Sequence, residues 1–578
     1  MKQTFGDRMA SFFNIRPGEG WLVSLLLAHS FSIGWARIFA RTAAFTLFLA
    51  EFDAQSLPYT YIGVSIIVTL ISFAYLKMGE RLSFSNLLIV TLSFLLITLI
   101  ALRVGLGLSG AGWLVFALPI WYEVLWTLTN LEFWNLAGRL FNVRQGKRLF
   151  GLIGSGEQVA IIIGGLLVPV LVGLIDISNL LLTAAVAIAA AVGLLFYITH
   201  SFADHLSAPV EKAAAKGQES GANLLRNRYI LLIYGLFGLG MVGFFFIDNI
   251  FYFQAEVQYP SQNQLASFIG VFFGVLGLIT LFSKALLTSP IMRHYGMRVG
   301  LLVTPVILAI SGTFTAVAGA AFGAVVFFFW LVAMTKLLSV VFVESVDVSA
   351  LNVLYQPLPA TLRLRVQTAV EGLAYPVSIG LAGLVLSLLT TFFAFGAIQL
   401  VYVLLFILTV WIVLAIHLGR GYQMMLAQAL AKRRLDARSV MVVDGSSIAV
   451  LQQTLHSPNA GAAIYALDTL KAMEHESLPA ALEGLLAHPA LEVRQHALRC
   501  IEELGLTSAQ TAVRQRVSQE PSARVRGTAL RTLAALGEAE SLETVSAYLE
   551  DGDPHVRRGV MVGLLRSGGI EGVLIAGH

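Results

Sequence analysis

The stretch YEVLWTLTNLEFWNLAGRLFNVRQGKRLFGLIGSGEQV, residues 122–159, is the part of the sequence that most clearly indicates the fold class. It begins as an apolar helix of membrane-spanning length, breaks at a basic loop, and continues as a second apolar run with a carboxylate inside it. A carboxylate at bilayer depth costs about 2.5–3.5 kcal/mol, so the polar faces of these helices are expected to look inward. With 3.6 residues per turn, one stripe holds Glu123, Trp126, Asn130 and Trp134, and another holds Glu132, Asn135 and Arg139. The stretch is either a packed polar seam or part of a solute pathway.

The composition is that of a membrane protein. Of 578 residues, 57% are hydrophobic and 12% charged, with a mean hydropathy of +0.78. Soluble domains carry about 25% charged residues, so most of this chain is expected in lipid. The single cysteine, Cys500, excludes an intramolecular disulfide and a thiolate metal cluster, and no motif indicates a metal, a cofactor or a hydrolytic site. We expect a protein that is not an enzyme.

Twelve apolar segments approach or exceed the roughly 20 residues that a bilayer requires. They lie at about 21–50, 59–77, 84–107, 110–141, 149–174, 178–199, 228–254, 264–288, 299–319, 322–348, 366–391 and 394–418.

Among the loops between the spans, only alternate ones contain Lys or Arg. The loops at 51–58, 108–111, 175–177, 255–263, 320–321 and 392–393 hold none, whereas the intervening loops and both flanks are basic. The positive-inside rule therefore predicts cytoplasmic termini and an even number of spans. A bacterial inner membrane is the expected location.

The membrane part divides into two halves. A polar linker at 200–227 separates a first half at 21–199 from a second at 228–418, and residues 1–20 are expected to form an amphipathic helix on the membrane. The two halves show a weak internal sequence repeat, since the first span of one ends in FTLFLAE at Glu51 and the first span of the other in FYFQAE at Glu256. Two such halves predict a substrate site at their interface near the midplane.

The region after the spans is soluble and repetitive. A basic juxtamembrane helix and connector occupy 419–445, and residues 446–578 resemble HEAT repeats. AAIYALDTL (462–470), VRQHALRCI (493–501), VRGTALRTL (525–533) and VRRGVMVGL (556–564) align at intervals of 31 or 32 residues. The recurring arginines, Arg494 among them, are expected to be solvated turn residues. The solenoid is expected to be incomplete at its C-terminal end, because no polar capping element is present.

Charged residues inside the spans are the candidate substrate ligands. Arg37 and Arg41 lie four residues apart on one helix face, and their guanidinium groups suit phosphate or carboxylate. The alternative is an ion pair with Glu123, Glu132 or Glu344 that locks the bundle.

The second half carries its own polar set. Lys336 and Asp347 share a face of span ten, with Glu344 adjacent. These three residues either add to an anion site and act as gates, or neutralise one another. Asp248 in span seven is a candidate for proton coupling, or else a structural hydrogen-bonding residue beside Asn249. The candidate substrate ligands are Arg37, Arg41, Glu123, Trp126, Asn130, Glu132, Asn135, Asp248, Lys336, Glu344 and Asp347.

Two further stretches carry a resemblance to known families. RHYGMRVGLL (293–302) looks like the conserved loop of major facilitator transporters. The stretch that begins at residue 123, together with LYQPLPATLRLRVQTAVEG (354–372), resembles the ADP/ATP carriers of plastids and obligate intracellular bacteria. The resemblance implies a 6+6, major facilitator-like, all-α bundle of twelve spans over about residues 15–420, followed by a cytoplasmic HEAT solenoid.

The resemblance also implies exchange of nucleotides across a membrane. By position, the matching residues are Trp126, Trp134, Lys147, Arg148, Tyr355, Arg363, Arg365 and Glu371. Of these, the basic and acidic residues join Arg139 and Glu157 as candidate gating or cytoplasmic-loop residues. Two lysines of the family pattern have no counterpart, one after Arg37 or Arg41 and one near residues 377–380.

Two functional hypotheses follow. The first is a secondary transporter of an organic anion, with a nucleotide foremost, whose solenoid regulates transport or binds a cytosolic partner. The second is a membrane receptor or scaffold that signals through the solenoid without net transport. Lipid movement through the bundle is a weaker third. None of the three involves a nucleic acid.

Overall fold

The computed structural model describes residues 15–16, 18–108, 112–203, 206, 227–286, 296–431, 445–472, 476–536, 539–567 and 573. The described residues group into two compact units. The first holds those within Met1–Ile291, Gly300–Ala350 and Leu364–Leu418, and the second those within Met292–Val299, Leu351–Arg363 and Gly419–His578. The predicted N-terminal amphipathic helix, most of the 200–227 linker and most of the chain end after residue 567 lie outside the described residues.

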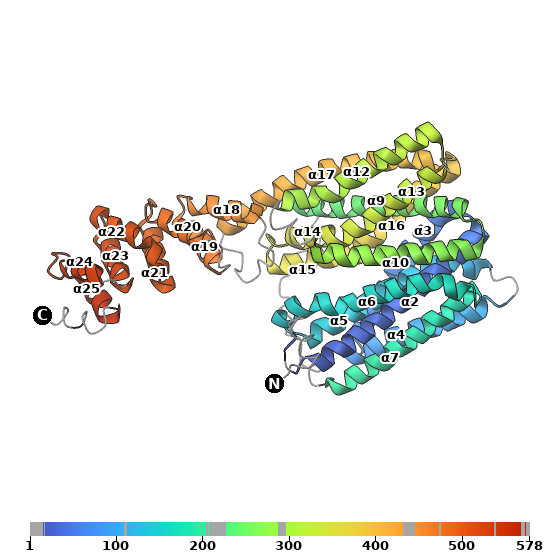
Figure 1. Ribbon diagram of the computed structural model, residues 1–578, viewed down its shortest axis with the longest axis horizontal. Coiled ribbons are helices and arrows are strands. Elements are labelled where there is room, and N and C mark those ends of the chain that lie inside the picture. The colour runs from blue at the N-terminus through green and yellow to red at the C-terminus, as the bar shows by residue number, and fades with distance from the viewer. Residues whose placement is uncertain are drawn as a thin grey trace. The chain divides into compact units, whose positions relative to one another are not determined.

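The first half of the membrane bundle contains six long helices (Figure 1). They are α2 (Gly20–Phe52), α3 (Leu57–Gly79), α4 (Phe84–Gly105), α5 (Gly112–Leu140), α6 (Val143–Val172) and α7 (Leu180–Ser201). Short 3₁₀ turns, η1 (Ala54–Ser56) and η2 (Ile177–Asn179), precede α3 and α7.

The second half repeats this plan with two interrupted spans. Four of its spans are single helices: α9 (Arg228–Gln258), α10 (Gln262–Leu286), α12 (Gly296–Phe322) and α17 (Ala397–Ala431). Span ten consists of α13 (Val326–Phe342), η5 (Val343–Asp347) and α14 (Val348–Leu354). Span eleven consists of α15 (Ala360–Ala369), η6 (Val370–Ala374), α16 (Tyr375–Ser387) and η7 (Leu388–Phe392). The elements η5, η6 and η7 are π-helical turns. Within the described residues, twelve helices are long and apolar enough to cross a membrane, which confirms the predicted number.

Side-chain caps explain where several spans begin. Ser83 accepts a hydrogen bond from the Asn86 amide at the start of α4, and Asn227 accepts one from the Tyr229 amide at the start of α9. At α6, Asn142 and Gln145 form a reciprocal capping box, so the helix restarts immediately after the break in the 122–159 stretch.

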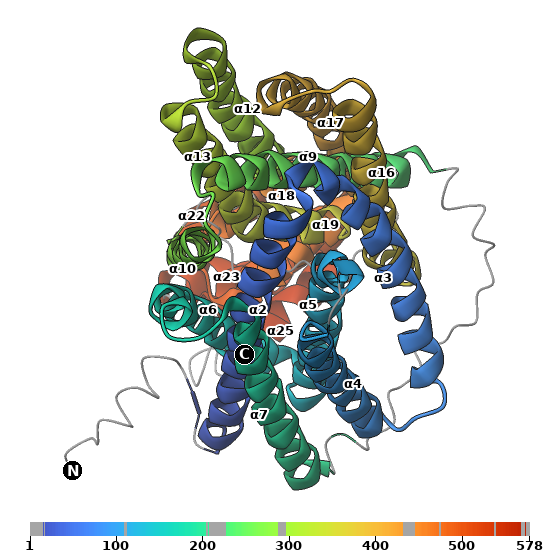
Figure 2. The same cartoon turned by 90° about the vertical axis from the view of Figure 1, so that its right-hand side faces the viewer.

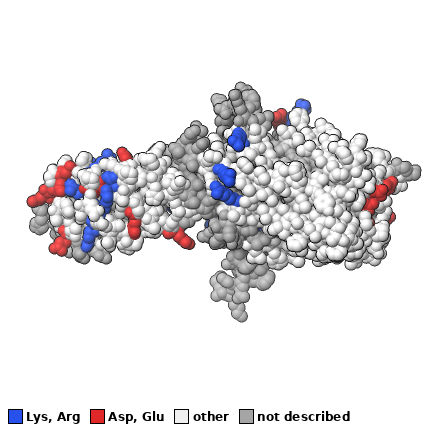
Figure 3. Space-filling model, turned by 90° about the horizontal axis from the view of Figure 1, so that it is seen from above, with Lys and Arg blue, Asp and Glu red and all other residues white. Residues whose placement is uncertain are grey.

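The outer surface of the bundle is apolar. Large side chains such as Leu70, Phe73, Phe196 and Phe406 are more than half exposed, a pattern that lipid-facing spans require. Figure 3 shows most of one face of the bundle free of charged side chains. The polar residues are therefore concentrated between the helices.

The most extensive contacts between the halves are made by two helix pairs: α6 packs against α10, and α3 packs against α16 (Figure 2). Glycine permits close approach in both pairs. A Cβ atom added to Gly165 of α6 would lie 2.8 Å from the Gly274 Cα of α10, and one added to Gly383 of α16 would lie 3.0 Å from the Ile62 amide of α3. Small residues allow helix backbones to pack this closely in a membrane. The glycine-rich run at 151–165 thus serves packing.

The soluble region is a row of four helix pairs (Figure 1). The pairs are α18 (Gly445–Leu455) with α19 (Ala460–Ala472), α20 (Leu478–Leu485) with α21 (Leu491–Leu504), α22 (Gln510–Gln519) with α23 (Ala523–Ala535), and α24 (Ala539–Ser546) with α25 (Pro554–Ser567). The second helix of each pair carries the repeated motif and packs on the next, α21 on α23 and α23 on α25. This is the stacking expected of a solenoid.

One expectation about the solenoid is wrong. Arg494 is 8% exposed rather than solvated, and its guanidinium donates two hydrogen bonds to Glu520, at 3.0 and 2.8 Å. It also donates to the backbone carbonyls of His488 and Pro489. Arg494 therefore ties neighbouring helix pairs together, a role that the periodicity did not reveal.

We expect Gly165→Leu to lower the free energy of unfolding by about 1–3 kcal/mol, because the added side chain must separate α6 from α10. The matched control is Gly193→Leu on α7, where an added Cβ would meet nothing within 4 Å. Thermal unfolding midpoints in detergent measure both variants. Equal midpoints would show that the close approach of α6 and α10 is not needed for stability.

Candidate functional site

The centre of the bundle contains ion pairs that join residues far apart in the sequence. Arg37 of α2 pairs with Glu157 of α6, and Lys336 of α13 pairs with Asp248 of α9 at 2.5 Å. Each pair links two spans of the same half. Low dielectric makes an unpaired charge expensive there, so pairing is the arrangement that physics favours.

Arg37 is held from several sides. Its Nε and Nη2 donate to the Thr129 hydroxyl at 3.1 and 2.8 Å, and Nη2 also donates to the Trp126 carbonyl at 3.1 Å. The alternative prediction, an ion pair of Arg37 with Glu123, Glu132 or Glu344, is wrong, because Arg37 pairs with Glu157. Its charge and its donors are therefore already engaged.

Lys336 and Asp248 are equally enclosed. Lys336 is 1% exposed, and its ammonium lies 4.1 Å from the ring centre of Phe244. Tyr61 of α3 donates to Asp248 at 3.2 Å, which brings a residue of the first half onto a pair of the second. The expectation that Asp347 or Glu344 neutralises Lys336 is wrong. Asp347 accepts from Thr304 at 2.6 Å, and Glu344 pairs with Lys284 at 2.7 Å.

Arg41 differs from both. Among the described residues it makes no ion pair and no hydrogen bond, and its buried Nε has no partner. Its guanidinium instead faces two rings, Tyr122 of α5 at 4.9 Å and Phe273 of α10 at 4.2 Å. Cation–π contacts stabilise the group but leave its hydrogen-bond donors available. Because Phe273 belongs to the second half, Arg41 lies where the two halves meet.

Glu123 lies close to Arg41 and to a break in span eleven. Tyr375, the first residue of α16 after the π-helical turn η6, donates to Glu123 at 3.4 Å. The Tyr375 ring lies 6.0 Å from that of Trp126, centre to centre. Protein surrounds Arg41 and Glu123 deeply, yet each keeps an accessible portion of its side chain. A π-helical turn often marks a functional position, and here it sets the register of Tyr375.

The sequence analysis missed a histidine. His29 of α2 lies with its Nε2 3.1 Å from both carboxylate oxygens of Glu132, and both residues are 0% exposed. Glu132 is thus enclosed rather than accessible in this conformation. The available signal was the presence of a histidine inside an apolar span, which by default suggests a functional partner.

The remaining predicted residues are spread along the bundle. Trp126 and Asn130 are half-buried near the centre, whereas Asn135 is exposed and donates to the Tyr75 hydroxyl at 3.4 Å. Arg139 donates to the Leu206 carbonyl at 3.2 Å and lies over the Phe84 ring. Arg363 donates to the Gln356 carbonyl at 2.9 Å, and Arg365 is exposed. The side chains of Lys147 and Glu371 lie outside the described residues.

Arg148 connects the starts of two spans through an ion pair with Glu19. It donates to both carboxylate oxygens of Glu19, at 2.6 and 2.7 Å, and Gln145 donates to the same carboxylate at 3.0 Å. Burial by itself raises the pKa of Glu19, but hydrogen bonds from Gln145, the Arg16 amide and Arg148 outweigh burial and lower it to about 2. The start of α2 is thereby fixed to the start of α6.

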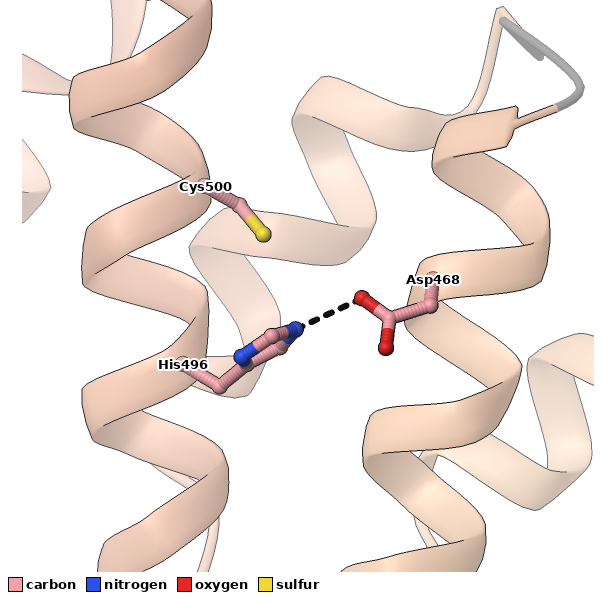
Figure 4. Close-up of side chains that lie close together, drawn as sticks. All are labelled: Asp468, His496 and Cys500. Atoms are coloured by element: carbon pink, nitrogen blue, oxygen red, sulfur yellow. Dashed lines mark hydrogen bonds and ion pairs between the residues drawn. The ribbon is translucent and has the colours of Figure 1, made fainter. Parts of the chain in front are cut away.

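In the solenoid, Asp468 of α19 and His496 and Cys500 of α21 converge (Figure 4). Their potential ligand atoms lie within 4.8 Å of one another, and His496 Nε2 is 2.7 Å from Asp468. Burial raises the pKa of the Cys500 thiol to about 11, although Lys471 opposes that shift. The Lys471 ammonium lies 4.0 Å from Sγ and pairs with Glu503. A protonated thiol beside an ammonium favours an interaction between repeats over a metal centre.

Solved structures define the class of the membrane part. A bacterial homologue of the iron transporter ferroportin superposes with a TM-score of 0.52 at 14% identity, covering 68% of this chain and 97% of that one. The nucleoside transporter NupG superposes with a TM-score of 0.50 at 16% identity, covering 70% and 98%. The membrane part therefore shares its fold with these two solved structures.

Sequence comparison then identifies the family. The family model described as TLC ATP/ADP transporter matches residues 113–422, and the chain belongs to this family. ADP,ATP carrier protein 1 of Chlamydia muridarum is 26% identical over 213 residues, covering 32% of this chain and 40% of that protein. The chloroplastic ADP,ATP carrier protein 1 of Arabidopsis thaliana is 25% identical over 204 residues, covering 32% of each chain.

The alignments thus span well under half of those relatives. The HEAT repeat model matches residues 511–573, which confirms that the soluble region contains HEAT repeats. The protein is an integral membrane protein of a transporter family, not an enzyme, as expected from the sequence.

We expect Glu19→Gln to destabilise the protein by about 1.5–3 kcal/mol at pH 7, the range for hydrogen bonds to a charged group. The folded-state pKa of about 2 lies below the ordinary 4.5, so the carboxylate stabilises the fold above pH 4.5. That contribution is lost as pH falls toward 2. Thermal unfolding of both proteins from pH 7 to pH 3 should show the gap in midpoint shrinking. A gap that stays constant with pH would contradict the proposed charge dependence.

We expect Cys500 to react slowly with a thiol-specific disulfide reagent at pH 7–8, and faster as pH rises toward 11, because only the thiolate attacks. Lys471→Met removes the ammonium that opposes the rise in pKa, and should slow the reaction further. Rapid labelling of the folded protein at pH 7 would show that the thiolate forms readily.

Proposed function

We propose that the protein is a secondary transporter that exchanges organic anions by alternating access, without hydrolysis. Nucleotides are the first substrates to test, because the TLC ATP/ADP transporter match and the chlamydial and plant carriers point to that class. The proposal assigns the substrate to the interface of the two halves.

The single observation that carries this proposal is the state of Arg41. A guanidinium without an ion pair among the described residues, contacted by α5 of one half and α10 of the other, is poised to receive an anionic group. Arg binds phosphate and carboxylate through paired N–H donors. Trp126 and Tyr375 supply aromatic surface next to Glu123, suited to a planar part of the same ligand.

Contacts between the halves support alternating access. The Ala54 amide donates to Glu256 at 2.8 Å, and Tyr59 and Thr391 share a hydrogen bond of 2.9 Å. The Phe45 and Tyr252 rings stack 4.3 Å apart at 5°. The loops nearest these contacts, 51–58 and 255–263, hold no Lys or Arg, which assigns them to the outer face. We propose that these contacts form the external gate in its closed position.

The same charge rule assigns both termini and the solenoid to the cytoplasm, and a bacterial inner membrane remains the proposed location. The proposed domains are 21–199 and 228–418 for the two halves and 446–578 for the solenoid. Of the predicted residues, Arg41, Glu123 and Trp126 are the proposed substrate contacts, with Arg37, Asp248 and Lys336 as their charged surroundings.

The fused HEAT solenoid favours a second candidate function. A solenoid offers an extended surface suited to a protein partner, so the chain is alternatively a receptor or scaffold built on a transporter fold. In this case the solenoid recruits a cytosolic protein and the bundle need not carry net flux.

The test is exchange in proteoliposomes preloaded with ADP and supplied with labelled ATP, then with labelled ADP and AMP. We expect uptake of at least one of these nucleotides, which requires internal nucleotide and falls at least tenfold in Arg41→Ala. The matched control is Arg420→Ala, which removes an exposed arginine of α17 outside the proposed site. Normal gel filtration and melting of both variants shows that the loss is not one of folding.

No exchange of any of these nucleotides by the folded wild-type protein, together with no Arg41-dependent shift in melting, would overturn the nucleotide proposal. The scaffold candidate would then be tested directly by measuring partner capture with the full chain and with a chain whose solenoid surface is substituted.

A further inference from the structure

The charges at the centre of the bundle balance. Among the described residues inside the spans, three cations and three carboxylates pair with one another or act electrostatically on Arg41. They are here termed the central charge set: Arg37, Arg41, Lys336, Glu123, Glu157 and Asp248. The His29–Glu132 pair is separate and fully enclosed. Transport of a highly charged anion would be helped by a surplus of positive charge, and the central charge set has none.

Two of the three cations are already neutralised. Arg37 is tied to Glu157 and to two groups of α5, and Lys336 is tied to Asp248 with side chains 2% and 12% exposed. Breaking a buried pair leaves an uncompensated charge and costs several kcal/mol, commonly about 3–5. A ligand therefore finds these two cations already paired, and Arg41 is the cation of the central charge set that has no ion pair among the described residues.

The cation that remains has a carboxylate beside it. Glu123 and Asp248 both act electrostatically on Arg41, and Asp248 is itself paired with Lys336. Among the described residues, Glu123 receives one hydrogen bond, of 3.4 Å from Tyr375, a weak contact that leaves most of its accepting capacity open. Arg41 and Glu123 thus place one guanidinium and one carboxyl group in the site, both partly accessible and neither in an ion pair among the described residues.

We infer that the site selects a solute that presents one anionic group to Arg41 and a hydrogen-bond donor to Glu123, with at most one uncompensated negative charge. The inference rests on the proposed function and narrows its substrate class. Each further phosphate places another negative charge near Glu123 and Asp248, where Coulomb repulsion is weakly screened. Monophosphates and other singly anionic organic solutes are accepted, and diphosphates and triphosphates are disfavoured.

The experiment measures binding across two charge series, by melting shift and calorimetry on the detergent-solubilised full chain. One series keeps the base and sugar constant: adenosine, cyclic AMP, AMP, ADP and ATP. The other has no base: orthophosphate, pyrophosphate and tripolyphosphate. EDTA is present throughout so that divalent cations do not mask phosphate charge. We expect the tightest binding among the monophosphates in each series, with ATP and tripolyphosphate at least tenfold weaker.

Variants connect the preference to its residues. Glu123→Gln removes one negative charge, and should shift the optimum toward the more highly charged ligands, raising ADP affinity at least tenfold. Arg41→Gln should abolish discrimination by charge. Glu51→Gln removes an exposed carboxylate from the same helix as Arg41, and should leave the charge preference unchanged.

The outcomes separate this inference from the proposed function. Affinity that rises steadily to ATP and tripolyphosphate would overturn the inference, while the proposed exchange of nucleotides would stand. Binding that peaks at low charge in the base-free series, with no adenine compound bound, would support the inference and remove nucleotides as substrates. Absence of Arg41-dependent binding in both series would overturn the inference, and proteoliposome exchange would then decide the function separately.

Discussion

The constraint on which this structure depends is the cost of placing charge in a bilayer. Nearly all of the ionisable side chains described inside the spans meet an opposite charge or form a hydrogen bond. Arg37 finds Glu157, and Lys336 finds Asp248, each on a different helix. Because every such pair fixes the register of two spans, the charges position the helices as much as the apolar surfaces do.

Close backbone approach provides the second part of the architecture. Gly165 and Gly274 let α6 and α10 touch, and Gly383 does the same for α16 against α3. Since lipid tails are as apolar as the helices themselves, shape rather than hydrophobicity makes these interfaces specific. Both interfaces join a helix of the first half to a helix of the second.

The π-helical turns of the spans lie at or next to polar residues. The turn η5 carries Glu344 and Asp347, and η6 directly precedes Tyr375, whose hydroxyl contacts Glu123. A π-helical turn shifts the helix register by one residue and so re-aims a side chain. The π-helical turns occur in spans ten and eleven, and none occurs in the described parts of spans one to six. The second half is therefore the more irregular of the two.

The sequence by itself determined the class of structure: its apolar runs predicted twelve spans, its alternate basic loops an orientation, and its 31- or 32-residue period a helical solenoid. These features are local, so hydropathy, charge and periodicity report them directly. Only the tertiary structure decided the pairing. Asp248 and Lys336 lie 88 residues apart, and His29 and Glu132 lie 103 apart. The sequence of one helix does not show which charged residue of another helix will face it, because the partner depends on how the spans pack. That Arg41 has no ion pair among the described residues is therefore visible only once the partners of the other charged residues are known.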